Sequence, residues 1–232
     1  QKRIVAILDK AFEGIDKAIA NTEKNLANAR ELFESYLNNV FSQKGDGWVE
    51  KRFEEVCENL DNRRIPITKS KRTTGNIPYY GASGVVDYVS DYIFDEELLL
   101  VSEDGANLLA RTYPIAFSIN GKSWVNNHAH VLRFSNKHLQ KCIEYYLNSI
   151  SFEPYVSGMA QPKLNQKALN SIIVPVPPEE QKQCLADTLD AISSQVQGLE
   201  TIYQQKRTAL NELKQSLLNK AFSGELTSDT VQ

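Results

Sequence analysis

The chain has 232 residues, of which 41% are hydrophobic and 24% charged, a composition that excludes disorder over the whole length. It contains no apolar run near the roughly 20 residues that cross a bilayer, and its first residues lack the features of a signal peptide, so we expect a cytoplasmic protein. The net charge of −3 argues mildly against a nucleic-acid-binding protein, but the acidic excess lies in residues 179–232 and the middle of the chain is balanced.

Residues 1–43 predict one long helix with a single buried stripe, because apolar or small side chains recur at steps of three and four. The stripe consists of Ile4, Leu8, Ala11, Ile15, Ile19, Thr22, Leu26, Ala29, Phe33, Tyr36 and Val40. At 1.5 Å per residue such a helix would reach roughly 60 Å, which is too long for a helix that wraps around a small core. A two-helix coiled coil fits this length better.

Residues 44–178 predict a mixed α/β globule, which begins near Gly45-Asp46-Gly47. Short β-rich stretches are expected at 85–88, 92–94, 98–102, 115–119 and 129–134, with an amphipathic helix at 137–149. Five basic residues fall inside ten positions of this segment and predict a local positive face, with solvated loop charge as the alternative. They are Arg63, Arg64, Lys69, Lys71 and Arg72.

Residues 179–226 predict a second long helix, followed by a short tail at 227–232. Its entry, Pro177-Pro178-Glu179-Glu180, has proline and acidic residues where a helix begins. Its apolar positions alternate steps of four and three, which is a heptad seam with one interruption at Lys206. The seam consists of Leu185, Leu189, Ile192, Val196, Leu199, Tyr203, Lys206, Leu210, Leu213 and Leu217. The predicted fold class is therefore α+β, a globule carried on a long antiparallel two-helix coiled coil.

The two predicted helices also resemble each other in sequence, which indicates an internal duplication. Six residues of the first helix match six of the second at one constant offset. The pairs are Leu32 with Leu213, Ser35 with Ser216, Leu37 with Leu218, Asn38 with Asn219, Phe41 with Phe222, and Ser42 with Ser223. Gln1-Lys2 likewise matches Gln181-Lys182. We therefore expect the chain to be a piece of a longer protein.

Several motifs, in this order and between two long helices, resemble the specificity subunits of type I restriction-modification systems. The resemblance covers nearly the whole chain, although no single motif is decisive. It is carried by Ile77-Pro-Tyr-Tyr-Gly-Ala-Ser-Gly84, Val101-Ser-Glu-Asp-Gly-Ala-Asn107, Gly121-Lys-Ser-Trp-Val-Asn-Asn-His-Ala-His130, Gln161-Pro-Lys-Leu-Asn165, Ile172 to Val176, and the Pro-Pro-Glu-Glu-Gln entry to the last helix.

The resemblance implies a function in DNA recognition. In that family two target-recognition domains each read one half of a split DNA sequence, and paired helices hold them at a fixed separation. Modification subunits dock on the helices and methylate adenine with S-adenosylmethionine. The expected partners are thus double-stranded DNA, modification subunits and a restriction subunit. This chain has one recognition domain, so it would read half of a site. The other half would be read by a second copy of the chain, through self-association as a half-subunit, or by a second domain.

No catalytic residue, cofactor site or metal site is expected on this chain. An adenine methyltransferase needs a glycine-rich cofactor loop and an Asn/Asp-Pro-Pro-aromatic loop, and a translocating motor needs a GxxxxGK[ST] loop. All three are absent from the sequence. His128 and His130, two apart in an expected strand, would point from the same face, but a third metal ligand is missing at convincing spacing. The three cysteines lack CxxC spacing, which favours reduced, buried thiols.

Twelve residues are candidates for DNA contacts. Asparagine amides can pair with adenine, lysines with phosphate, and tyrosines beside glycines with phosphate or a base. The alternatives are turn-forming asparagines, a tyrosine packed under a turn, and solvated lysines. The segment Ser102 to Gly105 predicts a turn or a contact with a cytosine amino group, in preference to a nuclease carboxylate pair. The candidates are Lys69, Lys71, Arg72, Tyr79, Tyr80, Ser83, Asn107, Lys122, Asn126, Asn127, His128 and Lys163.

Two other function classes remain open from the sequence. The chain would be a structural adaptor if its coiled coil dimerised chains and its globule bound protein. It would be part of a fused restriction-methylation enzyme if the catalytic domains lay elsewhere on a longer chain. The duplicated helices and the motif order favour the DNA-specificity reading, because an adaptor leaves both unexplained.

Overall fold

The computed structural model describes residues 2–158 and 161–226, and the tail expected at 227–232 lies outside them. The chain divides into two compact units. The first consists of residues 1–36 and 190–232, and the second of residues 37–189. In the part of the chain that is described, no helix has the length and apolarity that a bilayer crossing requires.

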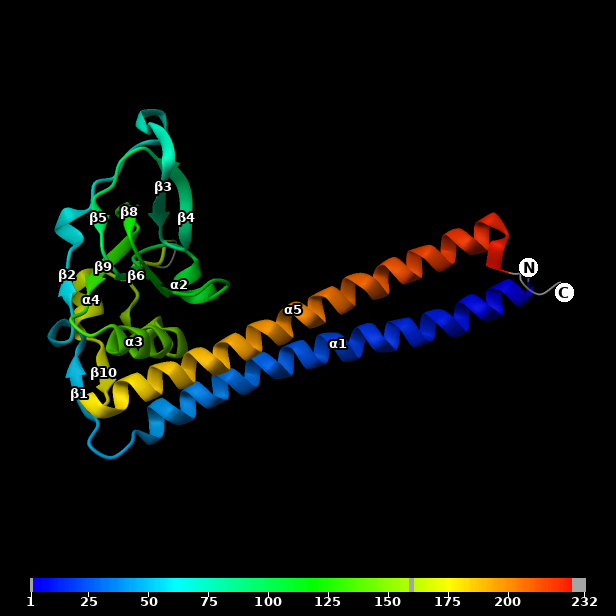
Figure 1. Ribbon diagram of the computed structural model, residues 1–232, viewed down its shortest axis with the longest axis horizontal. Helices are drawn as coiled ribbons and strands as arrows, with labels where there is room; N and C mark the ends of the chain where they lie inside the picture. The colour runs from blue at the N-terminus through cyan, green and yellow to red at the C-terminus, as the bar shows by residue number, and fades with distance from the viewer. Residues whose placement is uncertain (1, 159–160, 227–232) are drawn as a thin grey trace. The chain divides into compact units, whose positions relative to one another are not determined.

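The first unit is a pair of antiparallel helices, formed by most of α1 (Lys2–Gln43) and of α5 (Glu179–Ser223), which Figure 1 shows side by side. Three interhelical ion pairs fix the register: Arg30 with Glu200, Glu23 with Arg207, and Asp16 with Lys214. Successive pairs lie seven residues apart on both helices, in opposite chain directions. The antiparallel coiled coil that the sequence predicts is therefore confirmed.

The buried stripe of α1 is as predicted, since every residue of it is buried or half-buried. The seam of α5 is narrower than predicted. Val196, Tyr203, Leu210 and Leu217 are half-buried, whereas the alternating positions Leu199 and Leu213 are 41% and 48% exposed. The neighbouring helix therefore covers the column of Val196, Tyr203, Leu210 and Leu217 better than the column of Leu199 and Leu213.

The second unit is built from two four-stranded sheets and a strand pair. One sheet has the order β2-β9-β6-β7 and is antiparallel, with strands Glu58–Asn59, Ala129–Arg133, Leu98–Ser102 and Ala116–Ile119. The other has the order β4-β3-β8-β5, with strands Gly84–Val89, Thr74–Gly81, Lys122–Val125 and Phe94–Asp95, and β3 pairs with β8 in parallel. The pair joins β1 (Val49–Arg52) to β10 (Ile173–Val176).

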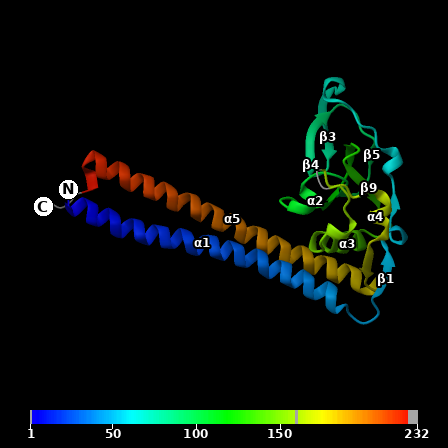
Figure 2. The same cartoon turned by 180° about the vertical axis from the view of Figure 1, so that it is seen from behind.

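Three further α-helices and four short 3-10 helices complete this unit. The α-helices are α2 (Asn107–Ala110), α3 (Lys137–Ser149) and α4 (Gln166–Ser171). The 3-10 helices are η1 (Phe53–Glu55), η2 (Asp61–Arg63), η3 (Lys69–Lys71) and η4 (Glu153–Tyr155). Figure 2 shows the same elements from behind. The helix at 137–149 begins and ends as predicted, and Asn136 caps it by accepting from the backbone N–H groups of His138 and Leu139.

Strand β6 is central to the second unit, because all five of its residues are buried. Leu99 and Val101 face one apolar cluster, which includes Leu132 and residues of α3. Leu98 and Leu100 face a second cluster, which includes Val131. The same alternation on β9 places His130 on the face that it shares with Leu132, so a histidine occupies a core position.

The strands at 85–88, 98–102, 115–119 and 129–134 are found with bounds that differ by one residue at most, and the stretch expected at 92–94 begins later, as β5. Strands β1, β2, β3, β8 and β10 were not expected as strands. β3 contains two glycines and a proline, which weaken the strand pattern, and its ladder is irregular between Thr74 and Ile77.

The heptad-spaced ion pairs predict which residues a short crosslinker can join. With Cys57, Cys142 and Cys184 replaced by alanine, the pair Asp16→Cys with Lys214→Cys should be joined within one chain by a short bismaleimide. The matched pair Asp16→Cys with Arg207→Cys is one heptad out of register, about 10 Å further along the axis, and should react poorly. Gel mobility and mass spectrometry at low protein concentration measure both. Equal yields from the two pairs would contradict this register.

Candidate functional site

Four segments of the second unit meet at one place, held by hydrogen bonds between their backbones. They are residues 81–84, 103–107, 126–128 and 161–165, called the loop cluster below. Glu103 N donates to His128 O over 2.9 Å, Leu164 N donates to Glu103 O over 2.8 Å, and Gly105 N donates to Pro162 O over 3.0 Å. The Ser102 hydroxyl donates to Ala82 O over 2.5 Å, which adds the first segment. Residues far apart in the sequence thus form one surface.

Four of the twelve predicted DNA contacts are exposed in the loop cluster: Ser83, Asn127, His128 and Lys163. Asn107, also in the cluster, is half-buried, and its amide exchanges hydrogen bonds with the backbone of Tyr113. Tyr80 precedes the cluster and is half-buried.

Asn126 is 7% exposed, and its side-chain oxygen accepts from His128 N over 2.8 Å, which is the role of a turn-forming asparagine. Nothing measured on the chain tests the twelve assignments, so they stay predictions.

A second group of predicted contacts lies along residues 65–72, which pack against Tyr79. That tyrosine is 1% exposed, and its hydroxyl accepts from Ile67 N over 3.0 Å, so the segment is bound to a buried side chain. The Arg72 guanidinium lies 4.3 Å from the centre of the Tyr79 ring and 2.9 Å from Asp87 Oδ2. Lys69 and Lys71 are exposed.

The local positive face predicted from five basic residues is smaller than expected. Arg64 turns inward, Arg63 lies 3.5 Å from Glu96, and Arg72 pairs with Asp87. Carboxylates thus balance three of the five charges.

The remaining candidate, Lys122, begins β8, and its ammonium lies 4.6 Å from the centre of the exposed Tyr92 ring. Strand register pairs it with Asp95. It is separate from the loop cluster.

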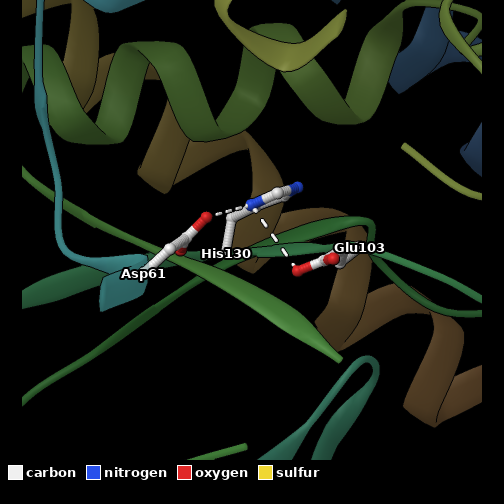
Figure 3. Close-up of side chains that lie close together, drawn as sticks. All are labelled: Asp61, Glu103 and His130. Carbon is white, nitrogen blue, oxygen red and sulfur yellow. Dashed lines mark hydrogen bonds and ion pairs between the residues drawn. The ribbon is translucent and has the colours of Figure 1, made fainter. Parts of the chain in front are cut away.

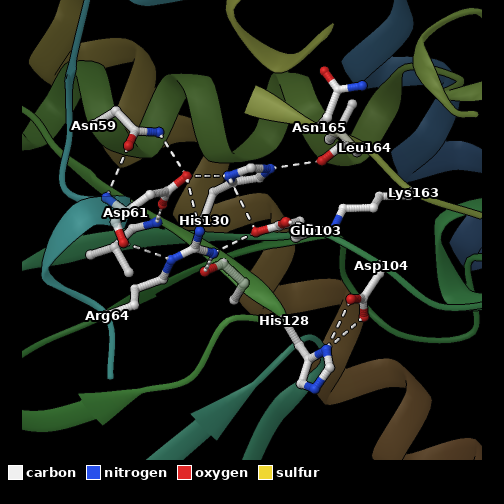
Figure 4. Close-up of polar contacts among 12 residues, drawn as sticks. Asn59, Asp61, Arg64, Glu103, Asp104, His128, His130, Lys163, Leu164 and Asn165 are labelled. Atoms are coloured by element: carbon white, nitrogen blue, oxygen red, sulfur yellow. Dashed lines mark hydrogen bonds and ion pairs between the residues drawn. The ribbon is translucent and has the colours of Figure 1, made fainter. Parts of the chain in front are cut away.

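His128 and His130 do not share a face, so that expectation was wrong. His128 lies in the turn before β9 and is largely exposed, because the strand begins only at Ala129. Its Nδ1 lies 2.9 Å from Asp104 Oδ2, as Figure 4 shows. His130 is 1% exposed within the sheet. Residues two apart share a face only within a strand, and β9 begins at Ala129, so it does not include His128.

His130 lies at the centre of a buried polar network formed with Asp61, Arg64 and Glu103 (Figures 3 and 4). Its Nδ1 is 2.6 Å from Asp61 Oδ2, and its Nε2 is 2.8 Å from the backbone oxygen of Leu164. Glu103 Oε2 lies 3.9 Å from the same Nδ1.

Arg64 closes the network on one side, since Nη1 donates to Glu103 Oε2 over 2.5 Å and Nη2 lies 3.5 Å from Asp61 Oδ2. Asp61 also accepts from Val131 N, and Lys163 Nζ lies 3.1 Å from Glu103 Oε1. Each buried charge therefore has an opposite charge beside it, as buried ions require.

The carboxyl pKa values in the network follow from these contacts. Burial alone would raise the pKa of Asp61, but the hydrogen bond and charge of His130, with Val131 N and Arg64, outweigh it and lower that pKa. Burial also opposes ionisation of Glu103, and its pKa is lowered by the hydrogen bond from Arg64, the charges of His130 and Arg64, and Lys163. The raised pKa of Cys57, about 12, has burial as its main cause and Asp61 as the second, so this thiol is unreactive.

Asp61, Glu103 and His130 bring three potential ligand atoms within 4.8 Å of one another, a set that could hold a metal ion. The sequence search did not find this set, because the acids lie 69 and 27 positions before His130 and come from different segments. The donors do not fit a metal well. Both carboxylates already bind the Arg64 guanidinium, and Lys163 lies beside Glu103, so cations occupy the places that a metal would take.

Asp61, Arg64, Glu103 and Asp104 were missed as members of the site. Glu103 and Asp104 lay in a segment interpreted as a turn or a contact with a cytosine amino group, and Arg64 was counted with an exposed basic run. One signal in the sequence was usable: a histidine that alternates with apolar residues in a strand, as His130 does, needs buried polar partners.

Comparison with known proteins was made by sequence and by structure. A family model of the type I restriction modification DNA specificity domain matches residues 45–206. A protein of Haemophilus influenzae named as a type I restriction enzyme specificity subunit is 36% identical over 144 residues, which are 62% of this chain and 37% of that protein.

Two solved structures share the fold. The HsdS subunit from Thermoanaerobacter tengcongensis has a TM-score of 0.61 at 24% identity and covers 97% of this chain. A chain from a study of assembly and conformational transition of the type I R-M system has a TM-score of 0.77 at 22% identity and covers 96%. This chain spans 58% of the length of each.

The lowered carboxyl pKa values predict a loss of stability in acid. The stability that Asp61 and Glu103 supply is fully present above their ordinary values, 3.8 and 4.5, and is lost as pH falls through the lower folded values. Urea unfolding at a series of pH values should show a falling free energy of unfolding below about pH 5. Glu103→Gln should reduce that slope, whereas Glu97→Gln, at an exposed residue outside the network, should keep it. A wild-type slope in Glu103→Gln would contradict the assignment.

Proposed function

This chain belongs to the type I restriction-modification DNA specificity family, and we propose from that premise that it is a non-catalytic recognition unit that reads one half of a split DNA site. The observation that carries the proposal is the loop cluster: exposed polar side chains from four segments gather on the unit that the family model matches. Side chains on rigidly held loops are the usual readers of base edges and phosphates. The acting complex would be cytoplasmic.

We assign two roles to the candidate residues. Ser83, Asn127 and His128 in the loop cluster would face base edges, because their short or planar side chains carry both donors and acceptors. Lys69, Lys71 and Lys163 would contact phosphate, because lysine ammonium groups are point charges that position a protein on a duplex. Tyr79, Asn126 and Asn107 would support these loops from within, which the burial of the first two favours.

The helix pair would carry the modification subunits, which bind S-adenosylmethionine and methylate adenine, and through them the restriction subunit. Apolar side chains on α5 support a partner on this pair, since Leu199, Ile202 and Leu213 are 41%, 57% and 48% exposed. Exposed apolar columns on a helix mark surfaces that other chains cover. The chain itself would hold no cofactor.

The duplicated helices support a second recognition domain beside the end of α5. Phe41, in the last turn of α1, is buried, with its ring 5.2 Å from that of Tyr146 and 6.4 Å from that of Trp48. Its repeat equivalent, Phe222, is 88% exposed. A large aromatic ring at a duplicated position is expected to pack against a duplicated partner. A second recognition domain, or the domain of a second copy of this chain, would supply that partner.

A protein-binding adaptor and a part of a fused restriction-methylation enzyme are the alternatives. Methylome sequencing of cells that express the intact system distinguishes all three. We expect adenine methylation within a split motif, and we expect one half of that motif to change when residues 44–178 are exchanged for those of a relative. If no split motif carried adenine methylation, the result would contradict the proposal and favour the adaptor.

The phosphate role predicts a change in salt dependence. One recognition unit should bind a duplex weakly, with an affinity that falls steeply as salt rises. Replacing Lys71 or Lys163 by alanine should reduce the slope of log affinity against log salt by about one in each case. Lys137→Ala is the matched control. The loop cluster adjoins the start of β9, whereas Lys137 begins α3, which follows the end of that strand. An unchanged slope in both variants would remove these lysines from the contacts.

A further inference from the structure

The hydrogen bonds of His130 determine which protons its ring carries. The ring is buried, and each nitrogen faces an oxygen: Nδ1 faces Asp61 Oδ2 over 2.6 Å, and Nε2 faces the Leu164 backbone oxygen over 2.8 Å. A backbone carbonyl only accepts hydrogen bonds. Asp61 receives donors on both oxygens, from Val131 N on Oδ1 and from Asn59 Nδ2 on Oδ2, and Arg64 Nη2 lies 3.5 Å from Oδ2, so its side chain is a carboxylate that also only accepts. Both ring nitrogens must therefore donate, and the ring is a buried imidazolium.

The surroundings of the ring compensate that charge. Asp61 comes from the segment after β2, and Glu103 follows β6, so two carboxylates from different elements face one ring. Arg64 and Lys163 are the other charged groups of the network, and both contact Glu103. A neutral ring would leave one nitrogen lone pair facing an acceptor oxygen, at a distance that only a hydrogen bond allows.

The ring is connected to two groups at the surface. Leu164, which accepts from His130, is the neighbour of Lys163, and Lys163 is held in turn by backbone hydrogen bonds to Ser157. On its other side His130 follows His128 by two residues, and the backbone oxygen of His128 accepts from Glu103 N. Rotation or loss of the ring would remove the donor to the Leu164 carbonyl, which is one of the hydrogen bonds that hold the segment presenting Lys163.

We propose that His130 is a positioning residue for DNA recognition: its buried imidazolium joins Asp61 to the 161–165 segment and thereby fixes Lys163 for contact with a DNA phosphate. The proposal rests on the function proposed above, and it adds a residue that no DNA atom touches. Glu103 completes the same arrangement, because its carboxylate lies 3.9 Å from His130 Nδ1 and 3.1 Å from Lys163 Nζ, and Arg64 binds that carboxylate from the other side. Loss of His130 should therefore weaken binding through Lys163 and not through a general loss of the fold.

Nuclear magnetic resonance of the imidazole nitrogens tests the charge directly. The chain has three histidines, so single substitutions of His128 and His138 assign all signals. Near neutral pH we expect the two ring nitrogens of His130 to be protonated, with slow exchange of both protons. In Asp61→Asn the same ring should lose one proton. A single ring proton on His130 in the wild-type chain would overturn the proposal.

A double-mutant cycle tests the positioning role with a fluorescein-labelled duplex of mixed sequence as the probe. His130→Gln keeps only one donor group, and we expect it to reduce the salt slope by about one, as Lys163→Ala does. In the Lys163→Ala background His130→Gln should have no further effect on the slope. Equal losses of affinity in both backgrounds would show a merely structural role and overturn the proposal.

Two further measurements keep the result interpretable. Circular dichroism and thermal unfolding check that His130→Gln is folded at the assay temperature; if it is not, Asp61→Asn replaces it in the cycle with the same expectation. The wild-type chain is measured in parallel. If wild-type affinity for the duplex shows no salt dependence, the proposed function fails and the positioning role fails with it, although two protons on His130 would still identify the buried imidazolium.

Discussion

The compensation of two buried carboxylates, Asp61 and Glu103, is the constraint on which the predicted recognition surface depends. Ionised groups that leave water lose several kcal/mol of hydration, so each must have an opposite charge and hydrogen bonds in return. Arg64, His130 and Lys163 supply these, His130 from within strand β9 and the other two from segments without regular secondary structure. These contacts join the segments that carry the five side chains.

The same network explains why the loop cluster is ordered without a large apolar core of its own. Residues 103–107 and 161–165 share backbone hydrogen bonds, Glu103 adds ion pairs with Arg64 and Lys163, and Leu164 alone of these residues packs into the first apolar cluster. The apolar cores lie on either side, one toward α3 and one between the sheets. Strand β6 is buried on both faces, so the acidic residues that follow it emerge at a fixed place. The position of the recognition surface is thus set by a strand that makes no contact with solvent.

The sequence was sufficient for elements with strong periodicity and insufficient for contacts between distant segments. Helix α3 and strand β6 have the predicted bounds, because their apolar patterns are unbroken. Strand β3 was missed, since Gly75 and Pro78 interrupt its pattern and its pairing with β8 is parallel and non-local. The network of His130 was missed for a different reason. Its members are separated by up to 103 positions, from Asp61 to Leu164, and they meet only through the pairing of β9 with β6 and β2 and the backbone hydrogen bond from Leu164 to Glu103.

The side chains that are proposed to contact bases are exposed, whereas the polar network beneath them is buried. This difference determines which residues can change without disturbing the fold. Ser83, Asn127 and His128 are exposed at turns, where a substitution alters few internal contacts. Asp61, Glu103 and His130 each make hydrogen bonds or ion pairs inside the network, so replacing one removes a partner from the others and costs roughly 1–3 kcal/mol. Under the proposed function, new base preferences are accessible through the exposed turn residues while the network stays constant. The helix pair is independent of both, because the ion pairs that set its register lie within the other compact unit. A recognition unit built in this way can change the sequence that it reads without changing the scaffold that carries it.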